Sequence, residues 1–236
     1  MKVLIVATSH AQMGDNVRKT GLWLEELVIP YYIFKEAGSV VTIASPLGGD
    51  IPLDPKSESI LASTPTIRRF QKDPECVSEL SHSIPLHELK AEDFDMVFVA
   101  GGHGAMWDFR ENTALKELLE DFNRQHKITG FVCHGVAALL GLRDDMGELF
   151  VKGRRLTAYS NSEEGVAGLT GIVPFSLESE LVAAGALYSK SADYTNYMVT
   201  DGHLICGQNA ISSRDVSREM LAQLKKSQVE APTALN

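Results

Sequence analysis

The chain has 236 residues, of which 44% are hydrophobic and 22% are charged, and its formal net charge is −9. An acidic chain without a cluster of lysine and arginine binds nucleic-acid phosphates and anionic membrane surfaces poorly, so we expect neither as a partner. The composition is typical of a folded protein, and we expect one domain over residues 1–236 that buries its core without disulfides.

The cysteines are few and far apart. The chain contains three of them, Cys76, Cys133 and Cys206, and no CxxC pair. This spacing excludes a zinc knuckle and a dithiol redox motif, and it favours a reducing compartment. No apolar run approaches the roughly 20 residues that span a membrane, and the apolar start of the chain is too short for a signal peptide. We therefore predict a cytoplasmic protein.

Short β-branched runs alternate along the chain with longer amphipathic segments. The alternation predicts, in order, a strand at 2–7, a helix at 20–37, strands at 40–44 and 96–100, a helix at 113–126 with Asn112 as its N-cap, a strand at 128–132, and helices at 136–142 and 213–226. Strands that are apolar on both faces are typical of a covered parallel sheet. The pattern predicts a doubly wound α/β fold, whose ligands bind beyond the carboxyl ends of the strands.

Two stretches interrupt this rhythm. Residues 46–90 contain six prolines and little periodicity. Long irregular segments of this kind are often functional, so the stretch is either a cap over the site or a surface insertion without a role. Residues 141–159 predict a connection from a helix to a hairpin. Residues 230–236 predict a frayed tail.

Cys133 is the strongest candidate nucleophile. It follows the predicted strand at 128–132 directly, and His134 and Gly135 lead from it into the next predicted helix. A thiol at a strand-to-helix turn resembles a nucleophile elbow, and a helix N-terminus beside an imidazole lowers a thiol pKa. The alternative is a buried structural cysteine, which is our interpretation of Cys76 and Cys206.

A glycine-rich turn ends the neighbouring strand. Gly101, Gly102, His103 and Gly104 follow residue 100, with neither the lysine of a P-loop nor the spacing of a dinucleotide-binding turn. Backbone N–H groups in such a turn can bind an oxyanion. The turn is therefore a candidate oxyanion hole for the cysteine.

Two carboxyl groups interrupt the apolar face of the helix predicted at 20–37. If Glu25 or Glu26 points inward near the thiol, burial and like charge raise its pKa, and it becomes an acid that can shuttle protons. The alternative is a pair of solvated surface glutamates. The seven histidines form no HxH or HExxH pattern, and we predict no metal site.

These motifs together resemble the ThiJ/PfpI superfamily. Within it, the chain is similar to the branch that holds glyoxalase III-type chaperone proteins and class I glutamine amidotransferase-like proteins. The matching segments are 20–30, 44–55, 100–104, 131–135, 157–164, 174–175 and 207–209.

The resemblance implies a flavodoxin-like fold, a homodimer and a set of site residues. Cys133 takes the place of the nucleophile, Glu26 of the glutamate that hydrogen-bonds it, and His134 of the triad histidine. The triad acid falls within 161–164, where Glu164 is favoured over Glu163. The backbone N–H groups of Gly102 and His134 would form the oxyanion hole.

The activity that this resemblance implies is a glyoxalase III-type reaction without cofactor or metal. A small reactive 2-oxoaldehyde, methylglyoxal, would be converted to a 2-hydroxy acid, D-lactate. The alternatives are a stress-response chaperone or redox sensor, a protein deglycase and, ranked below these, a cysteine peptidase or amidase. Glutamine hydrolysis is rejected because His203-Leu204-Ile205 lacks the His-x-Glu dyad of a glutamine amidotransferase.

Overall fold

The computed structural model describes residues 1–15, 18–59 and 63–230. Its centre is a seven-stranded sheet in the order β3-β2-β1-β4-β5-β9-β8, and only β8 is antiparallel to its neighbour. The strands are β1 (Lys2–Val6), β2 (Val40–Ser45), β3 (Ile84–Pro85), β4 (Met96–Val99), β5 (Ile128–Val132), β8 (Met198–Asp201) and β9 (Leu204–Gly207). The mostly parallel, doubly wound sheet confirms the predicted flavodoxin-like class.

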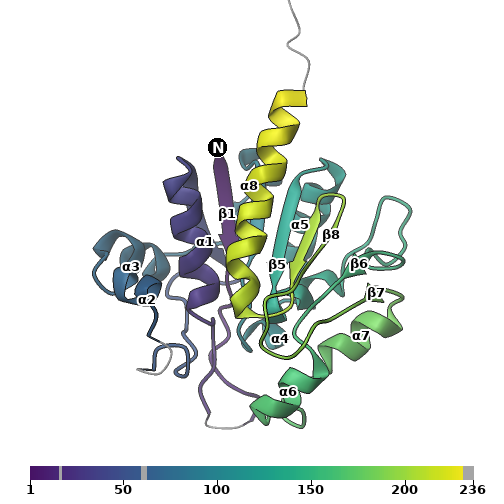
Figure 1. Ribbon diagram of the computed structural model, residues 1–236, viewed down its shortest axis with the longest axis horizontal. Coiled ribbons are helices and arrows are strands. Elements are labelled where there is room, and N and C mark those ends of the chain that lie inside the picture. The colour runs from purple at the N-terminus through teal and green to yellow at the C-terminus, as the bar shows by residue number, and fades with distance from the viewer. Residues whose placement is uncertain (16–17, 60–62, 231–236) are drawn as a thin grey trace, which may run out of the picture.

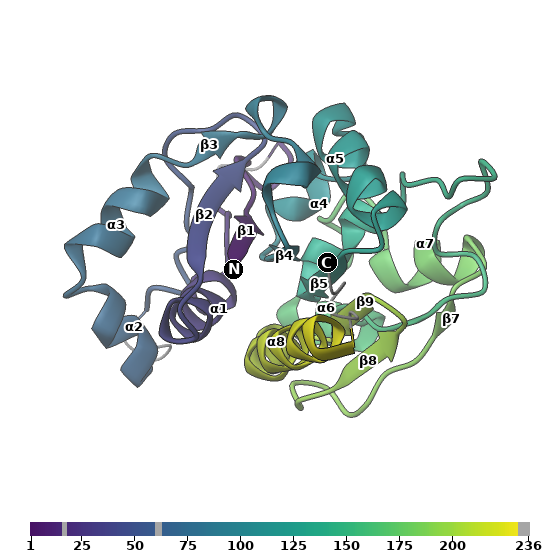
Figure 2. The same cartoon turned by 90° about the horizontal axis from the view of Figure 1, so that it is seen from above.

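Helices cover both faces of the sheet. Figure 2 shows α1 and α8 along one face and α4 and α5 along the other. The helices are α1 (Glu25–Glu36), α2 (Pro65–Phe70), α3 (Pro74–Ser81), α4 (Ala105–Asp108), α5 (Thr113–Arg124), α6 (Asn161–Ala167), α7 (Leu177–Ala183) and α8 (Ser213–Glu230). Among the described residues, no helix combines the length and the apolar character needed to cross a membrane.

The predicted strands are mostly apolar because both faces of the sheet are covered. Along β1, Leu4 and Val6 join the core under α5, whereas Val3 and Ile5 join the core under α1 and α8. Residues that alternate along a strand point to opposite faces. The two cores therefore share the strands β1, β2, β4 and β5, from which each core takes alternate residues. Each core also contains residues of the helices on its own face of the sheet.

The first helix begins five residues later than predicted. Thr20 donates its backbone N–H to Ala11, Leu22 forms a parallel bridge with Leu53, and α1 starts only at Glu25. Gly21, with φ 157°, lies so close to Pro52 that any side chain at this position would collide with the Pro52 carbonyl. The prediction was wrong here because these tertiary contacts hold the chain extended just before the helix.

The later helices differ from prediction in smaller ways. The segment predicted as a helix at 136–142 is instead a 3₁₀ helix, η4 (Cys133–Leu139), so the turn of the chain starts at the cysteine itself. Helix α5 begins at Thr113, and the Asn112 side chain accepts the N–H of Leu115 at 2.9 Å, which confirms the predicted N-cap. Helix α8 extends to Glu230, and residues 231–236 lie outside the described part of the chain.

The two irregular stretches lie at opposite edges of the sheet. Residues 46–90 contain α2, α3, β3 and η2 (Leu86–Glu88), and α2 and α3 pack beyond α1 (Figure 1). In the second stretch, Arg143 bridges Leu149 in an antiparallel pair, as predicted for a hairpin. Further on, β6 (Arg155–Leu156) pairs with β7 (Leu187–Tyr188) in a separate small sheet.

Candidate active site

Cys133 lies at the carboxyl end of β5, in a backbone conformation that non-glycine residues rarely adopt. Its φ is 57°, in the left-handed region, and the residue is 5% exposed. Strained residues of this kind persist only where the surroundings impose them, and they cluster at functional sites. The predicted elbow is therefore present as a sharp strand-to-3₁₀ turn that presents a thiol to a cavity.

Two backbone N–H groups reach the sulfur from different strands. The backbone N–H groups of Gly102, after β4, and of His134, after β5, face the Cys133 sulfur and lower the pKa of its thiol. Gly102 has φ 91°, and a Cβ atom there would lie 2.3 Å from the Gly21 carbonyl oxygen. Only glycine fits at position 102, so the sequence of the turn is fixed by the close approach of the backbone to this site.

Glu26 is the buried glutamate of the pair at the start of α1. It is completely buried, and its Oε2 accepts the N–H of Gly101 at 2.7 Å. Its Oε1 has no hydrogen-bond partner by geometry among the described residues, yet the carboxyl group interacts with the Cys133 thiol. Burial raises the pKa of Glu26 to about 8. The side chain is therefore a protonated acid at neutral pH, as expected for an inward-facing glutamate.

The thiol itself titrates differently from expectation. Burial raises the pKa of Cys133 above its ordinary value, and the nearby Glu26 carboxylate raises it further, although the two N–H groups oppose this. The prediction of a lowered thiol pKa was therefore wrong. The turn encloses the sulfur in a cavity beside a carboxyl group, and two acids in contact cannot both be ionised at low cost.

His134 connects the thiol to Glu164. Its Nδ1 lies 3.3 Å from the Cys133 sulfur, and its Nε2 lies 2.8 Å from Glu164 Oε2. Burial lowers the pKa of His134 to about 4, so the ring is neutral. Burial alone would raise the pKa of Glu164, but hydrogen bonds from His103 and His134 outweigh it and lower the pKa to about 2. An ionised carboxylate places the ring proton on Nε2 and leaves the Nδ1 lone pair facing the thiol.

Glu163, the alternative acid, points away from the thiol. Its carboxylate accepts five hydrogen bonds, and none of them comes from the cysteine or the histidines. The donors are Ser160 N–H at 3.0 Å, Ser160 Oγ at 2.8 Å, Gln208 Nε2 at 3.1 Å, Asn209 Nδ2 at 2.8 Å and Tyr194 N–H at 2.9 Å. Glu163 therefore links α6 by hydrogen bonds to the loop that precedes β8 and to the loop that follows β9.

We expect Glu163→Ala to destabilise the protein. The change would leave several buried donors without an acceptor, at about 1–3 kcal/mol each, so the free energy of unfolding should fall by at least about 3 kcal/mol. For a chain of this size that loss lowers the melting temperature by roughly 6–12 °C. Calorimetry would measure it against Glu111→Ala, whose side chain is 88% exposed. Equal melting temperatures in the two variants would contradict this role.

Two residues near the thiol were not predicted as site residues. His103, assigned at the sequence level only to the glycine-rich turn, donates from Nε2 to Glu164 Oε1 at 2.8 Å. The ring of Tyr159 lies 4.3 Å from that of His134, centroid to centroid. The sequence did hold a signal for both residues. His103 follows Gly102 directly and Tyr159 lies five residues before Glu164, and both Gly102 and Glu164 were predicted site residues.

The site opens into a cavity of about 220 Å³. Its lining residues are Trp23, Glu25, Glu26, Gly102, His103, Cys133, His134, Tyr159, Tyr194, Asn209, Ala210 and Ile211. None of these residues belongs to the described part of the stretch 46–90, and a capping role for that stretch stays a prediction. The stretch also supports the chain just before α1, where Asp54 accepts the Thr20 hydroxyl at 3.2 Å.

Among the residues that the structure describes, one group of side chains could hold a metal ion. Ligand atoms of His103, His134 and Glu164 lie within 4.8 Å of one another, and these residues are buried. Two imidazole nitrogens and a carboxylate suit a transition metal. In the present arrangement the carboxylate is occupied by both imidazole N–H groups, so a metal would have to displace two protons. The absence of a metal stays a prediction.

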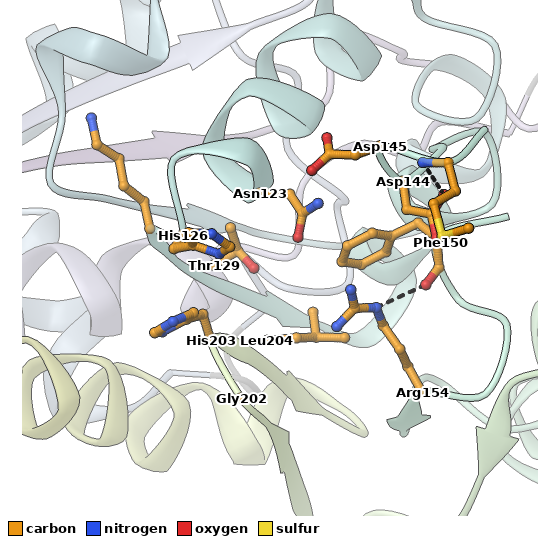
Figure 3. Close-up of a pocket in the computed structure, with 12 residues that line it drawn as sticks. Asn123, His126, Thr129, Asp144, Asp145, Phe150, Arg154, Gly202, His203 and Leu204 are labelled. Atoms are coloured by element: carbon orange, nitrogen blue, oxygen red, sulfur yellow. Dashed lines mark hydrogen bonds between the residues drawn. The ribbon is translucent and has the colours of Figure 1, made fainter. Parts of the chain in front are cut away.

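A second cavity lies at the opposite end of the strands from Cys133, beside the amino ends of β5 and β9. Its volume is about 330 Å³, and His126, Asn123, Asp144, Arg154 and His203 are among its lining residues (Figure 3). Arg154 donates to the carbonyl of Phe150, and Asp144 caps the following turn. These polar groups are occupied in holding loops, which gives this second cavity a structural explanation.

Comparison with known proteins supports this description of the fold. The model of the DJ-1/PfpI family matches residues 19–223. The glutathione-independent glyoxalase hsp3101 of Schizosaccharomyces pombe is 29% identical, covering 96% of each chain, and Glyoxalase 3 of Candida albicans is 24% identical, covering 94% of this chain and 98% of its own.

Two solved structures also match over nearly the whole chain. The Rapid Encystment Protein 24 kDa of Francisella tularensis has a TM-score of 0.90 at 37% identity, covering 94% of this chain and 98% of its own. Glyoxalase III of Candida albicans has a TM-score of 0.87 at 24% identity, covering 94% and 96%. The resemblance inferred from the motifs is confirmed.

Proposed function

The chain belongs to the DJ-1/PfpI family, and from this premise we propose that it is a glutathione-independent glyoxalase that converts methylglyoxal to D-lactate. The observation that carries the proposal is the position of Glu26, a completely buried carboxylic acid whose pKa is raised to about 8 and which lines the same cavity as the Cys133 thiol. Isomerising a 2-oxoaldehyde requires a proton to move between adjacent carbons, and an acid with a pKa near neutrality both donates and accepts it.

The reaction would begin with addition of the sulfur to the aldehyde. Cys133 attacks C1 while its thiol proton passes to His134 Nδ1, and the Glu164 carboxylate stabilises the resulting imidazolium. The N–H groups of Gly102 and His134 hold the oxyanion on O1. Glu26 then protonates O1. The product of this step is a hemithioacetal, with Glu26 ionised.

An internal redox step would follow, in which C1 is oxidised and C2 is reduced. The Glu26 carboxylate removes the C1 proton, and the His134 imidazolium protonates O2 to give an enediol. Glu26 delivers its proton to C2 and accepts the O1 proton, which leaves a lactoyl thioester. His134 then activates a water that hydrolyses the thioester and returns a proton to the sulfur. Atoms and electrons balance without any external oxidant or cofactor.

Lactate formation in D₂O tests this proposal. The protein should convert methylglyoxal to lactate without glutathione, and proton NMR would follow both compounds. A buried acid that transfers the C1 proton should keep part of that hydrogen on C2, whereas solvent-exposed chemistry would give C2 fully deuterated. Failure to form lactate would reject the proposal, and the chaperone, redox-sensor and deglycase alternatives would then take its place.

Two further expectations accompany the proposal. A small aldehyde is the expected partner, and the cavity of about 220 Å³ has room for one. The homodimer and the cytoplasmic location stay predictions that sedimentation and cell fractionation would test.

A further inference from the structure

We propose that His103 is a positioning residue that fixes Glu164, and through it His134, for proton transfer with the Cys133 thiol. The proposal rests on the glyoxalase reaction only for its turnover measurement. Glu164 has two carboxylate oxygens, and each accepts one imidazole N–H at 2.8 Å, from His134 on Oε2 and from His103 on Oε1. His103 thus holds the oxygen that His134 does not use.

The arrangement matters because a carboxylate held at one oxygen can rotate. A second donor on Oε1 removes this freedom, and it leaves Oε2 as the single acceptor for His134 Nε2. The side chains of His103 and Glu164 are only 10% and 9% exposed, so water does not readily replace the bond. The effect reaches the sulfur because His134 Nδ1 faces it at 3.3 Å.

Ring contacts add to this restraint. The His103 and His134 rings lie 4.1 Å apart, centroid to centroid, and Tyr159 packs against His134 at 4.3 Å and edge-on against His103 at 5.9 Å. A ring contact and a donated hydrogen bond are different contributions, and two substitutions separate them. His103→Phe keeps an aromatic ring and removes the N–H, whereas His103→Gln keeps an N–H donor of similar reach and removes the ring.

The bond from His103 to Glu164 predicts opposite outcomes for these variants. Proton transfer by a positioned group contributes about 10²–10⁴-fold. His103→Phe should lose part of that factor, roughly 10–100-fold in kcat, with KM changed less than about threefold. His103→Gln should keep at least a third of the wild-type kcat. His203→Leu serves as the control and should match the wild type, because His203 is an exposed histidine just before the amino end of β9, at the far end of the strands from Cys133.

The alkylation rate of Cys133 by iodoacetamide gives a second readout that needs no turnover. The phenylalanine variant should react several-fold more slowly at pH 7, and the glutamine variant should react as the wild type does. If the wild type forms no lactate, the proposed function fails while this measurement still decides the role of His103. Retained kcat and alkylation in the phenylalanine variant, or a glutamine variant that is as impaired as it, would overturn the proposal. Should the phenylalanine variant not fold, the glutamine variant decides alone.

Discussion

Cys133→Ala should abolish lactate formation from methylglyoxal in the absence of glutathione. The thiol is the atom that bonds to C1, so its removal eliminates the covalent intermediate, and we expect activity to fall by at least about 10⁴-fold. The two polar side chains next to the thiol do not replace it, because the imidazole of His134 is bonded to Glu164 and Glu26 is protonated. An assay for D-lactate with equal amounts of protein would measure the loss.

Cys206→Ala is the matched control for this substitution. Cys206 is a free, completely buried thiol in β9, and burial raises its pKa to about 12. Its side chain packs in the core between the sheet and α5 and does not line the cavity. The variant should therefore keep wild-type turnover with a small loss of stability. Substantial lactate formation by the Cys133 variant, or a loss of activity equal in both variants, would contradict a nucleophilic role for Cys133.

Much of the fold and the position of Cys133 could be predicted from the sequence because both follow from local rules. Apolar β-branched runs predicted the central parallel strands β1, β2, β4 and β5, and the rule that ligands bind beyond strand ends pointed to Cys133 and Gly102. Strands β8 and β9 were not predicted. β8 is partly buried along its whole length, and β9 (Leu204–Gly207) contains a cysteine and a glycine and lacks the β-branched run that marked the predicted strands.

The details of the candidate site could not be predicted in the same way, because they depend on the directions in which side chains point, and the sequence does not specify these. Whether Glu25 or Glu26 pointed inward was undecidable from periodicity, because α1 begins five residues later than the pattern indicated. His103 was overlooked because its role depends on Glu164, which is 61 positions away in the chain. The raised pKa of Cys133 was missed for a similar reason, since it results from burial beside Glu26.

Glu26→Gln should separate proton transfer from nucleophilic reactivity. Glutamine keeps the size of the side chain and an N–H donor for the sulfur, but it can neither remove nor deliver the C1 proton. Proton transfer by a positioned group contributes about 10²–10⁴-fold, so turnover should fall by at least about 100-fold. Alkylation of Cys133 should persist at pH 7, where Glu26 is protonated in the wild type, and should accelerate above about pH 8, where the variant lacks the carboxylate that raises the thiol pKa.

The same substitution should change how stability depends on pH. The folded-state pKa of Glu26 is about 8, above its unfolded value of about 4.5. Its contribution to stability is therefore fully present below about pH 4.5, and it is lost as the pH rises through 8. Each unit between the two values is worth about 1.4 kcal/mol. Glu26→Gln does not titrate, so its melting temperature should exceed that of the wild type by a margin that grows from pH 5 to about pH 8 and then levels off.

The matched control is Glu36→Gln, in the last turn of the same helix. The Glu36 side chain is 61% exposed and pairs with Arg69, and a surface pair of this kind contributes little to stability. This variant should keep wild-type turnover and the wild-type dependence of melting temperature on pH. A Glu26→Gln protein that retains turnover would remove Glu26 from the proton path. The expected divergence comes from ionisation of the buried Glu26 carboxyl group. If the melting temperatures of Glu26→Gln and the wild type ran parallel from pH 5 to pH 9, Glu26 would not ionise in this range.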